Sequence, residues 1–164
     1  MLIGNLLTFE VDAIVNPANI TLQGRGGLSG QILAAGGSDM ISACKAHGLC
    51  KPGNAVTTPG FGLPCRFVIH AVGPDWRGGN CGEDAVLARC YQSVLAQAKA
   101  NDIRTLALPA ISTGIFGYPI DLATAIAVQE VTEGAAESGL AMVVFVCRDA
   151  ATLAVYEQAL SQHE

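Results

Sequence analysis

The chain has 164 residues, of which 51% are hydrophobic and 14% are charged, and its formal net charge is −5. This composition excludes an intrinsically disordered protein, and the length suits one domain with a full hydrophobic core. The acidic balance and the scattered basic residues argue against a nucleic-acid binder. Because the apolar runs are short and no secretory signal opens the chain, we expect no membrane partner and a cytoplasmic location.

Strands and helices are predicted to alternate along the chain. The predicted elements, in chain order, are a short strand at 2–3, a turn at 4–7, a strand at 11–15, a helix at 31–35, a helix from the cap Ser38 to His47, strands at 54–58 and 67–72, a loop at 73–82, a helix at 83–100, a strand at 105–108, a helix at 121–138, a strand at 142–147, and a helix at 150–161 capped by Asp149.

The predicted strands are apolar throughout rather than alternating, which is typical of a sheet that helices cover on both faces. In such α/β sheets, ligands bind in the loops at the carboxyl ends of strands. Three candidate loops meet this description, and they follow Val15, Leu108 and Cys147.

The first loop is the glycine-rich stretch Gly24-Arg25-Gly26-Gly27-Leu28-Ser29-Gly30, which follows Asn16-Pro17-Ala18-Asn19. It matches neither a Walker A motif, nor a dinucleotide fingerprint, nor a nucleophile elbow. A strand, a glycine loop and a helix start in this order present backbone N–H groups to an anion. We therefore predict a pocket for a ligand that carries phosphate and sugar, with a flexible turn as the alternative.

The second loop, Ser112-Thr113-Gly114-Ile115-Phe116-Gly117, also lies between a buried strand and a helix. Two such loops at neighbouring strand ends are suited to clamp a diphosphate, and Phe116 is suited to cover a sugar face. Simple packing of Phe116 and Tyr118 is the alternative.

Cysteine and histidine residues give little indication of a metal. The spacing Cys44-x-x-His47-x-x-Cys50 lacks a fourth ligand, so we expect no metal site and no cofactor. The six cysteines contain no Cys-x-x-Cys pair and are expected to be reduced thiols. His70 lies within an apolar strand, where a structural, hydrogen-bonded histidine is the favoured interpretation over a catalytic one.

Four stretches together resemble the macrodomain family, and more narrowly its bacterial MacroD-type branch. They are 11–19 (VDAIVNPAN), 26–30 (GGLSG), 68–74 (VIHAVGP) and 109–119 (PAISTGIFGYP). The resemblance implies a single three-layer α/β/α macrodomain over residues 1–164, with a mixed six-stranded sheet between helices and a short first strand. It also implies a monomer that binds ADP-ribose or ADP-ribosylated protein, and an enzyme that removes mono-ADP-ribosylation from acidic side chains or deacetylates O-acetyl-ADP-ribose.

The resemblance also assigns site residues. Asn5 and Leu6 fall where the family reads adenine, and Arg148 falls near its adenine-stacking aromatic. Asn19 corresponds to the catalytic asparagine that holds the distal ribose and a water. The residues expected to line the α-phosphate and the distal ribose are Gly24, Arg25, Gly26, Gly27 and Leu28. Those expected to surround the diphosphate are Ser112, Thr113, Gly114, Ile115 and Phe116.

The chain departs from the branch at three positions. Ser29 stands in place of an aspartate that activates water, Leu33 replaces a histidine, and Arg25 replaces a loop glycine. Asn19 and Ser29 are thus the expected catalytic pair, and losing a general base typically costs about 10²–10⁴ in rate. We expect an ADP-ribosyl ester hydrolase of reduced rate; the alternatives are a non-catalytic ADP-ribose reader and an unrelated nucleotide-binding α/β domain.

Overall fold

The computed structural model describes residues 1–163. Its strands are β1 (Leu2–Ile3), β2 (Ala13–Ala18), β3 (Ala55–Pro59), β4 (Phe67–Val72), β5 (Thr105–Leu108) and β6 (Met142–Cys147). Its helices are the 3-10 helix η1 (Leu6–Thr8) and the α-helices α1 (Gly27–Gly36), α2 (Ser38–His47), α3 (Glu83–Ala100), α4 (Ile120–Gly134) and α5 (Ala150–Ser161). Among the described residues, no helix combines the length and apolar character needed to cross a bilayer.

The six strands form one mixed sheet in the order β1-β6-β5-β2-β4-β3. Each neighbouring pair is parallel except β3 and β4, which are antiparallel, so β3 is an edge strand of opposite direction. The carboxyl ends of the five parallel strands therefore lie along one edge of the sheet. Both predicted loops leave the sheet at this edge.

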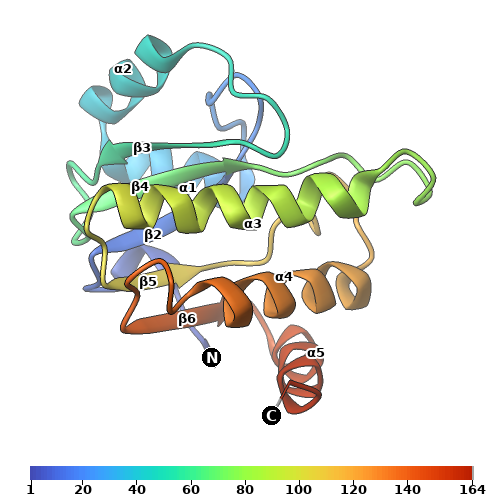
Figure 1. The fold of residues 1–164 in the computed structure, drawn as a ribbon. Coiled ribbons are helices and arrows are strands. Elements are labelled where there is room, and N and C mark those ends of the chain that lie inside the picture. The colour runs from blue at the N-terminus through green and yellow to red at the C-terminus, as the bar shows by residue number, and fades with distance from the viewer. Residues whose placement is uncertain (164) are drawn as a thin grey trace.

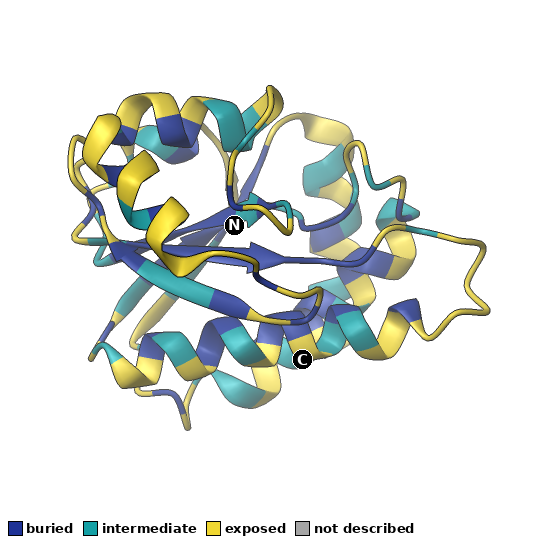
Figure 2. Cartoon of the chain, turned by 90° about the horizontal axis from the view of Figure 1, so that it is seen from above, coloured by how far each residue is buried: buried dark blue, intermediate teal, exposed yellow. Residues whose placement is uncertain are grey.

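Helices cover the sheet on both faces, and this confirms the three-layer α/β/α architecture (Figure 1). One hydrophobic core joins α3, α4 and α5 to the sheet, and a second joins η1, α1 and α2 to the opposite face. Figure 2 shows the strands largely buried between helices whose outer sides are exposed. Successive strand residues divide between the two cores: Val15 and Ile69 belong to the first, and Ile14 and Val68 to the second.

Three predicted elements have ends that differ from the observed ones by more than one residue, and the strand predicted at 54–58 lies one residue later, at Ala55–Pro59. The strand predicted at 11–15 lies at Ala13–Ala18, because Asp12 turns its carboxylate onto the N–H groups of Arg104 and Thr105 before the strand begins. The helix predicted at 31–35 begins at Gly27, within the glycine loop itself. The helix predicted at 121–138 ends at Gly134, since residues 135–139 form tighter turns, with Ser138 Oγ donating to the Gly134 carbonyl.

A buried polar network fixes the sheet just below the first loop. His70 on β4 is fully buried, and its Nδ1 accepts from Asn16 Nδ2 on β2 at 3.0 Å. The proton is therefore on Nε2, which donates to Thr58 Oγ1 on β3 at 2.9 Å. The structural role predicted for His70 is confirmed, since it joins three strands.

Candidate functional site

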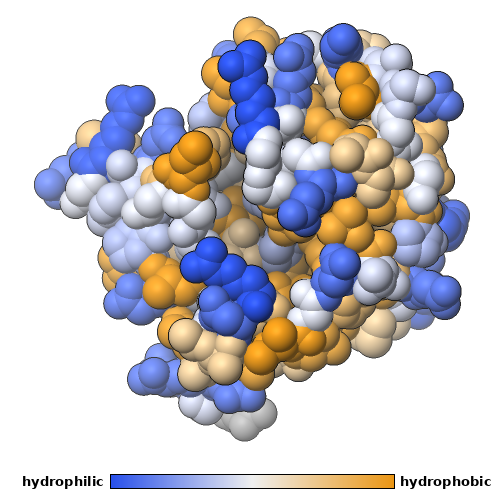
Figure 3. Space-filling model, turned by 180° about the vertical axis from the view of Figure 1, so that it is seen from behind, coloured by the Kyte–Doolittle hydropathy of each residue, from blue (hydrophilic) through white to orange (hydrophobic). Residues whose placement is uncertain are grey.

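A cleft of about 1100 Å³ runs along the carboxyl edge of the sheet. The segments that follow β1, β2, β4, β5 and β6 all contribute to its walls, together with the start of α1 and the first turns of α5. From behind, the surface is hollowed, with strongly hydrophilic and hydrophobic side chains around the hollow (Figure 3). Its position is the one expected for a ligand site in a parallel α/β sheet.

All the site residues proposed from the sequence line this one cleft. They are Asn5, Leu6, Asn19, Gly24, Arg25, Gly26, Gly27, Leu28, Ser29, Ser112, Thr113, Gly114, Ile115, Phe116 and Arg148. The fold thus brings together residues that are up to 143 positions apart, from Asn5 to Arg148. Their individual roles remain predictions.

The first loop presents the open N-terminus of α1 to the cleft. The N–H groups at the start of an α-helix have no acceptor within the helix, and here those of Gly27, Leu28 and Ser29 bond to no other described group. The loop is also tightly folded, since a Cβ on Gly24 would come within 2.7 Å of Ser29 Oγ. Partial positive charge and free donors therefore face the cleft from this side.

The second loop presents a further row of free donors. Within residues 1–163, the N–H groups of Thr113, Gly114, Ile115 and Phe116 have no hydrogen-bond acceptor. The loop closes on itself instead through the Gly117 N–H, which donates to the Gly114 carbonyl at 3.0 Å. Such a concave row of N–H groups binds anions without any basic side chain.

Ser112 adds a hydroxyl to this wall. It is buried, its Oγ has no hydrogen-bond partner in the described chain, and its φ of 66° lies in the left-handed region. A non-glycine residue in that region costs on the order of 1 kcal/mol. Strain and an unpaired buried hydroxyl at one position favour a polar ligand here.

The carboxamide of Asn19 has a fixed orientation. Its Oδ1 accepts from Thr21 Oγ1 at 3.1 Å and from the Gln23 N–H at 3.2 Å. Both lone-pair directions of this oxygen are therefore used, and only the Nδ2 group remains free to make hydrogen bonds, as a donor. Asn19 can thus donate to a hydroxyl or a water oxygen in the cleft, but it cannot accept a proton from one.

Ser29 lacks a partner that could activate it. Its buried Oγ makes no hydrogen bond within residues 1–163. Asp149 is the only carboxylate among the cleft-lining residues, and it lies at the start of α5 rather than in the first loop. A serine hydroxyl needs a neighbouring base to become a nucleophile or to take a proton, so the first-loop end of the cleft has no general base of its own.

The opposite end of the cleft is formed by η1 and the start of α5. Asn5 Oδ1 accepts from the Leu7 N–H at 3.1 Å and so caps η1, which leaves its amide NH₂ and one lone pair for a ligand. Arg148 is highly exposed and pairs with Asp149 at 3.3 Å. The Asp149 carboxylate accepts a hydrogen bond from the Thr152 N–H. This bond lowers the pKa of Asp149 below its ordinary value, and Arg148 lowers it further.

Some lining residues were not found from the sequence. They include Gly73, Pro109, Ala110, Cys147, Thr152 and Val155. Most of them directly follow a predicted strand or open the last helix, so their position at strand ends was the available signal. Trp76, in the predicted loop 73–82, contacts the second loop from outside the cleft, and no local pattern in the sequence indicates that contact.

Cys44, His47 and Cys50 do not form a common site. Cys44 and Cys50 are buried in the core beside α2, whereas His47 is exposed at the end of the helix. Cys44 Sγ lies 3.7 Å from the Nε2 of His70, and the described residues contain no group of three side chains that could hold a metal ion. Burial raises the pKa of both thiols, so they are poor metal ligands at neutral pH.

Comparisons with known proteins agree with this geometry. The Macro domain family matches residues 15–127. A macro domain-containing protein of Ralstonia nicotianae is 50% identical over 96% of this chain and 91% of its own length. An O-acetyl-ADP-ribose deacetylase of Klebsiella pneumoniae is 44% identical, over 99% of this chain and 96% of its own.

Solved macrodomain structures also superpose closely on this chain. The macrodomain of Oceanobacillus iheyensis with ADP superposes with a TM-score of 0.92 at 33% identity, over 98% of this chain and 88% of that one. A mutant of the same macrodomain, solved with ADPR, also superposes with a TM-score of 0.92, at 32% identity, over 99% of this chain and 91% of that one.

Proposed function

The chain belongs to the Macro domain family, and on that premise we propose that it binds ADP-ribose in the cleft and slowly hydrolyses esters of ADP-ribose. Residues 1–164 would form one macrodomain. The substrates would be O-acetyl-ADP-ribose, proteins that carry ADP-ribose on acidic side chains, or both. Support comes from a relative named O-acetyl-ADP-ribose deacetylase and from a related macrodomain solved with ADP and with ADPR.

One observation carries the proposal: two separate rows of unpaired N–H groups line the same cleft. The first row belongs to the start of α1 and the second to Thr113–Phe116. A diphosphate between them would accept hydrogen bonds from both, which accounts for an anion site in a protein of net charge −5. Arg25, an exposed cation in the first loop, would add attraction to the same phosphates.

The remaining parts of ADP-ribose have matching surroundings. Asn19 would donate from Nδ2 to a distal-ribose hydroxyl or to the attacking water. Adenine would lie at the other end, beside Asn5 and Leu6, with the Arg148 guanidinium against its face. Phe116, half-buried in the second loop, would cover the distal sugar.

The proposed hydrolysis is slow because the first-loop end lacks a base. Asn19 would orient the water that attacks either the acetyl carbon of O-acetyl-ADP-ribose or the anomeric carbon of glutamate-linked ADP-ribose. The bond to the leaving group breaks, which is the ribose oxygen in the first case and the glutamate carboxylate in the second, and the proton of the water passes to solvent or to that leaving group. Ser29 can pass on a hydrogen bond, but it cannot remove the proton of the water unaided. The reaction therefore depends on positioning and electrostatics.

A non-catalytic reader of ADP-ribose is the second candidate, and Ser29 is the observation that favours it. Its hydroxyl has no partner among the described residues, and within residues 1–163 the only carboxylate that lines the cleft, that of Asp149, is at the far end. Every feature that would bind the diphosphate is retained in this case. The two candidates differ only in turnover.

Calorimetric titration with ADP-ribose tests the binding that both candidates require. We expect saturable 1:1 binding, with ATP and NAD competing less well. Absence of binding at millimolar ADP-ribose would reject both candidates, and tighter binding of ATP or NAD would favour an unrelated nucleotide-binding domain.

Incubation with O-acetyl-ADP-ribose, and with protein ADP-ribosylated on glutamate, separates enzyme from reader. We expect slow release by the wild-type protein and a rate reduced by about 10–10³ in Asn19→Ala, because that variant loses the donor that orients water. If the wild-type rate equals the uncatalysed rate, the protein is not a hydrolase of these esters and the non-catalytic reader is the remaining candidate.

A further inference from the structure

The loop between β4 and α3 is organised by one buried carboxylate. Glu83, the first residue of α3, is only 3% exposed. Its Oε2 accepts from the N–H groups of Arg77 at 3.1 Å and Gly79 at 2.7 Å, and its Oε1 accepts from that of Cys81 at 2.6 Å. All three donors belong to the loop before the helix, so Glu83 fixes the path of residues 77–81.

These bonds are strong because they involve a charged acceptor. Burial alone raises the pKa of Glu83. The hydrogen bonds that its carboxylate accepts from backbone N–H groups outweigh this effect and lower the pKa below its ordinary value of 4.5. The carboxylate is therefore ionised at neutral pH. The neighbouring Asp84 differs, since it is exposed and accepts only from the Ala85 N–H.

Trp76 connects this loop to the second loop of the cleft. Its backbone N–H donates to the Phe116 carbonyl at 2.8 Å, and its ring packs against Tyr118 with centroids 4.6 Å apart. On the other side, a Cβ on Gly79 would come within 2.9 Å of the Trp76 ring. The indole is thus held between a residue that Glu83 fixes and the end of the second loop.

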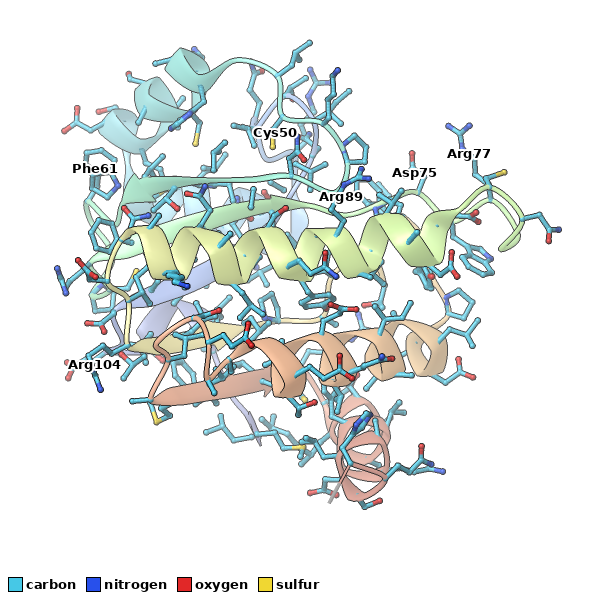
Figure 4. The ribbon with its side chains drawn as sticks, viewed as in Figure 1. Cys50, Phe61, Asp75, Arg77, Arg89 and Arg104 are labelled. Carbon is cyan, nitrogen blue, oxygen red and sulfur yellow. The ribbon has the colours of Figure 1, made fainter. Side chains whose placement is uncertain are left out.

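The second loop needs such support. Ser112 has a strained backbone, and Thr113–Phe116 leave their N–H groups unpaired. The contacts that hold its far end are the Trp76 bond to Phe116 and the bond from the Tyr118 N–H to the Ser112 carbonyl at 2.9 Å. Trp76 and Glu83 themselves do not line the cleft. Asp75 and Arg77 on the supporting loop point outward (Figure 4).

We propose that Trp76, fixed in place by Glu83, is a positioning residue that holds the N–H groups of the second loop in the arrangement that binds a diphosphate. This inference rests on the proposed function, since it concerns how the same cleft grips ADP-ribose. Neither residue would touch the ligand. Loss of either would leave the adenine end intact and loosen the grip on the phosphates.

The test compares Glu83→Gln with Asp84→Asn, which removes the same charge from the adjacent exposed position. Affinities for ADP-ribose and for adenosine, which has no phosphate, are measured by calorimetry. We expect Glu83→Gln to weaken ADP-ribose binding about tenfold and to leave adenosine binding within about twofold, because at least one loop N–H loses its acceptor and the binding-competent loop becomes less populated. Asp84→Asn should change neither affinity.

Trp76 provides a direct spectroscopic readout, since it is the only tryptophan in the chain. We expect ADP-ribose, but not adenosine, to change its fluorescence in the wild-type protein. In free Glu83→Gln, its emission should shift to the red as the indole becomes more hydrated. Trp76→Ala is the second variant if Glu83→Gln does not fold. It keeps the backbone bond to Phe116 but removes the ring that packs between Gly79 and Tyr118, so it should also weaken ADP-ribose selectively.

The outcomes separate this inference from the proposed function. If the wild-type protein fails to bind ADP-ribose, the proposed function and the inference both fall. If it binds but Glu83→Gln and Trp76→Ala bind ADP-ribose as tightly, the inference alone is overturned. An equal loss of adenosine and ADP-ribose affinity would also overturn it, because that result indicates general damage to the fold.

Discussion

The two loops that face the cleft use the same chemistry but are supported in different ways. The first loop runs into the start of α1, so helix geometry places the free N–H groups of Leu28 and Ser29, while Gly26 and Gly27 adopt positive φ values that glycine tolerates. The second loop is irregular, strained at Ser112, and held from behind by Trp76. The N–H groups at a helix start are placed by the helix itself, whereas an irregular row of donors depends on contacts from outside its loop, here those of Trp76, which does not line the cleft.

The two loops are also expected to contribute differently to turnover and to binding. The first loop contains Ser29 and follows Asn19, so changes of these two side chains should affect turnover more than binding. The second loop has no ionisable side chain, so changes in its support should affect binding of the diphosphate. Each prediction below either sharpens this division or breaks it.

Ser29→Asp should have the largest effect, and it tests the first loop. Supplying a carboxylate beside Asn19 should raise the hydrolysis rate by about 10²–10⁴, the usual contribution of a general base. Ser29→Ala should leave the rate within about twofold, because the hydroxyl has no partner to act with. Release of acetate from O-acetyl-ADP-ribose measures both; equal rates for the two variants would contradict the account of the first loop.

Lowering the pH should lower the free energy of unfolding through His70, which lies in the buried network below the first loop. Burial, with a smaller contribution from His47, lowers the pKa of His70 from 6.5 to about 4. The unfolded chain therefore takes up a proton at this residue before the folded one does. Stability is fully present above pH 6.5 and is lost as pH falls towards 4, by about 3 kcal/mol in all.

Urea unfolding between pH 7 and 4 measures this loss. In His70→Gln, the free energy of unfolding should be lower at pH 7 and should depend less on pH across this range. His163→Gln, which replaces an exposed histidine that does not act on His70, is the control and should retain the wild-type slope. If His70→Gln kept the full slope, the buried network would not be its source.

Gly73→Ala should damage the second loop. A Cβ at this position would lie 2.1 Å from Ser112 Oγ and 2.7 Å from Ile111 Cγ2. Such overpacking costs about 1–3 kcal/mol, which corresponds to ADP-ribose binding that is about ten- to a hundredfold weaker if the loop shifts. Gly30→Ala in α1, where a Cβ would make only ordinary contacts, is the matched control for calorimetry and should bind normally.

Arg148→Ala should have the smallest effect, since it changes neither loop. An exposed guanidinium on an aromatic face contributes about 0.5–1 kcal/mol, so ADP-ribose should bind about two- to fivefold less tightly. Adenosine should lose the same factor, and ribose 5-phosphate should lose nothing. A loss confined to ligands that carry phosphate would place Arg148 with the loops instead.

Much of the fold could be predicted from the sequence. Uniformly apolar strands such as 67–72 and 105–108 indicated a covered sheet, and the helix at 83–100 was found with its observed ends. The start of α1 was placed four residues late, because Gly27 and Gly30 argue against a helix locally. Tertiary packing of Ile32 and Leu33 against the sheet overrides this local preference.

The cleft was predictable to the extent that strand ends are predictable. Both loops were proposed because they follow predicted buried strands, whereas the role of Asn19 was proposed from the resemblance to the macrodomain family. The hydrogen bonds that use both lone pairs of Asn19 Oδ1 could not be foreseen, and neither could the contact between Trp76 and Phe116. These depend on how loops from different strand ends fold against one another, which no local pattern encodes.

A crystal structure with ADP-ribose tests the central claim most directly. The account predicts the diphosphate between the N–H groups of residues 27–29 and 113–116, the distal ribose beside Asn19 Nδ2, and adenine near Asn5 and Arg148. A diphosphate bound away from either row of N–H groups, or a ligand in the opposite direction along the cleft, would contradict it.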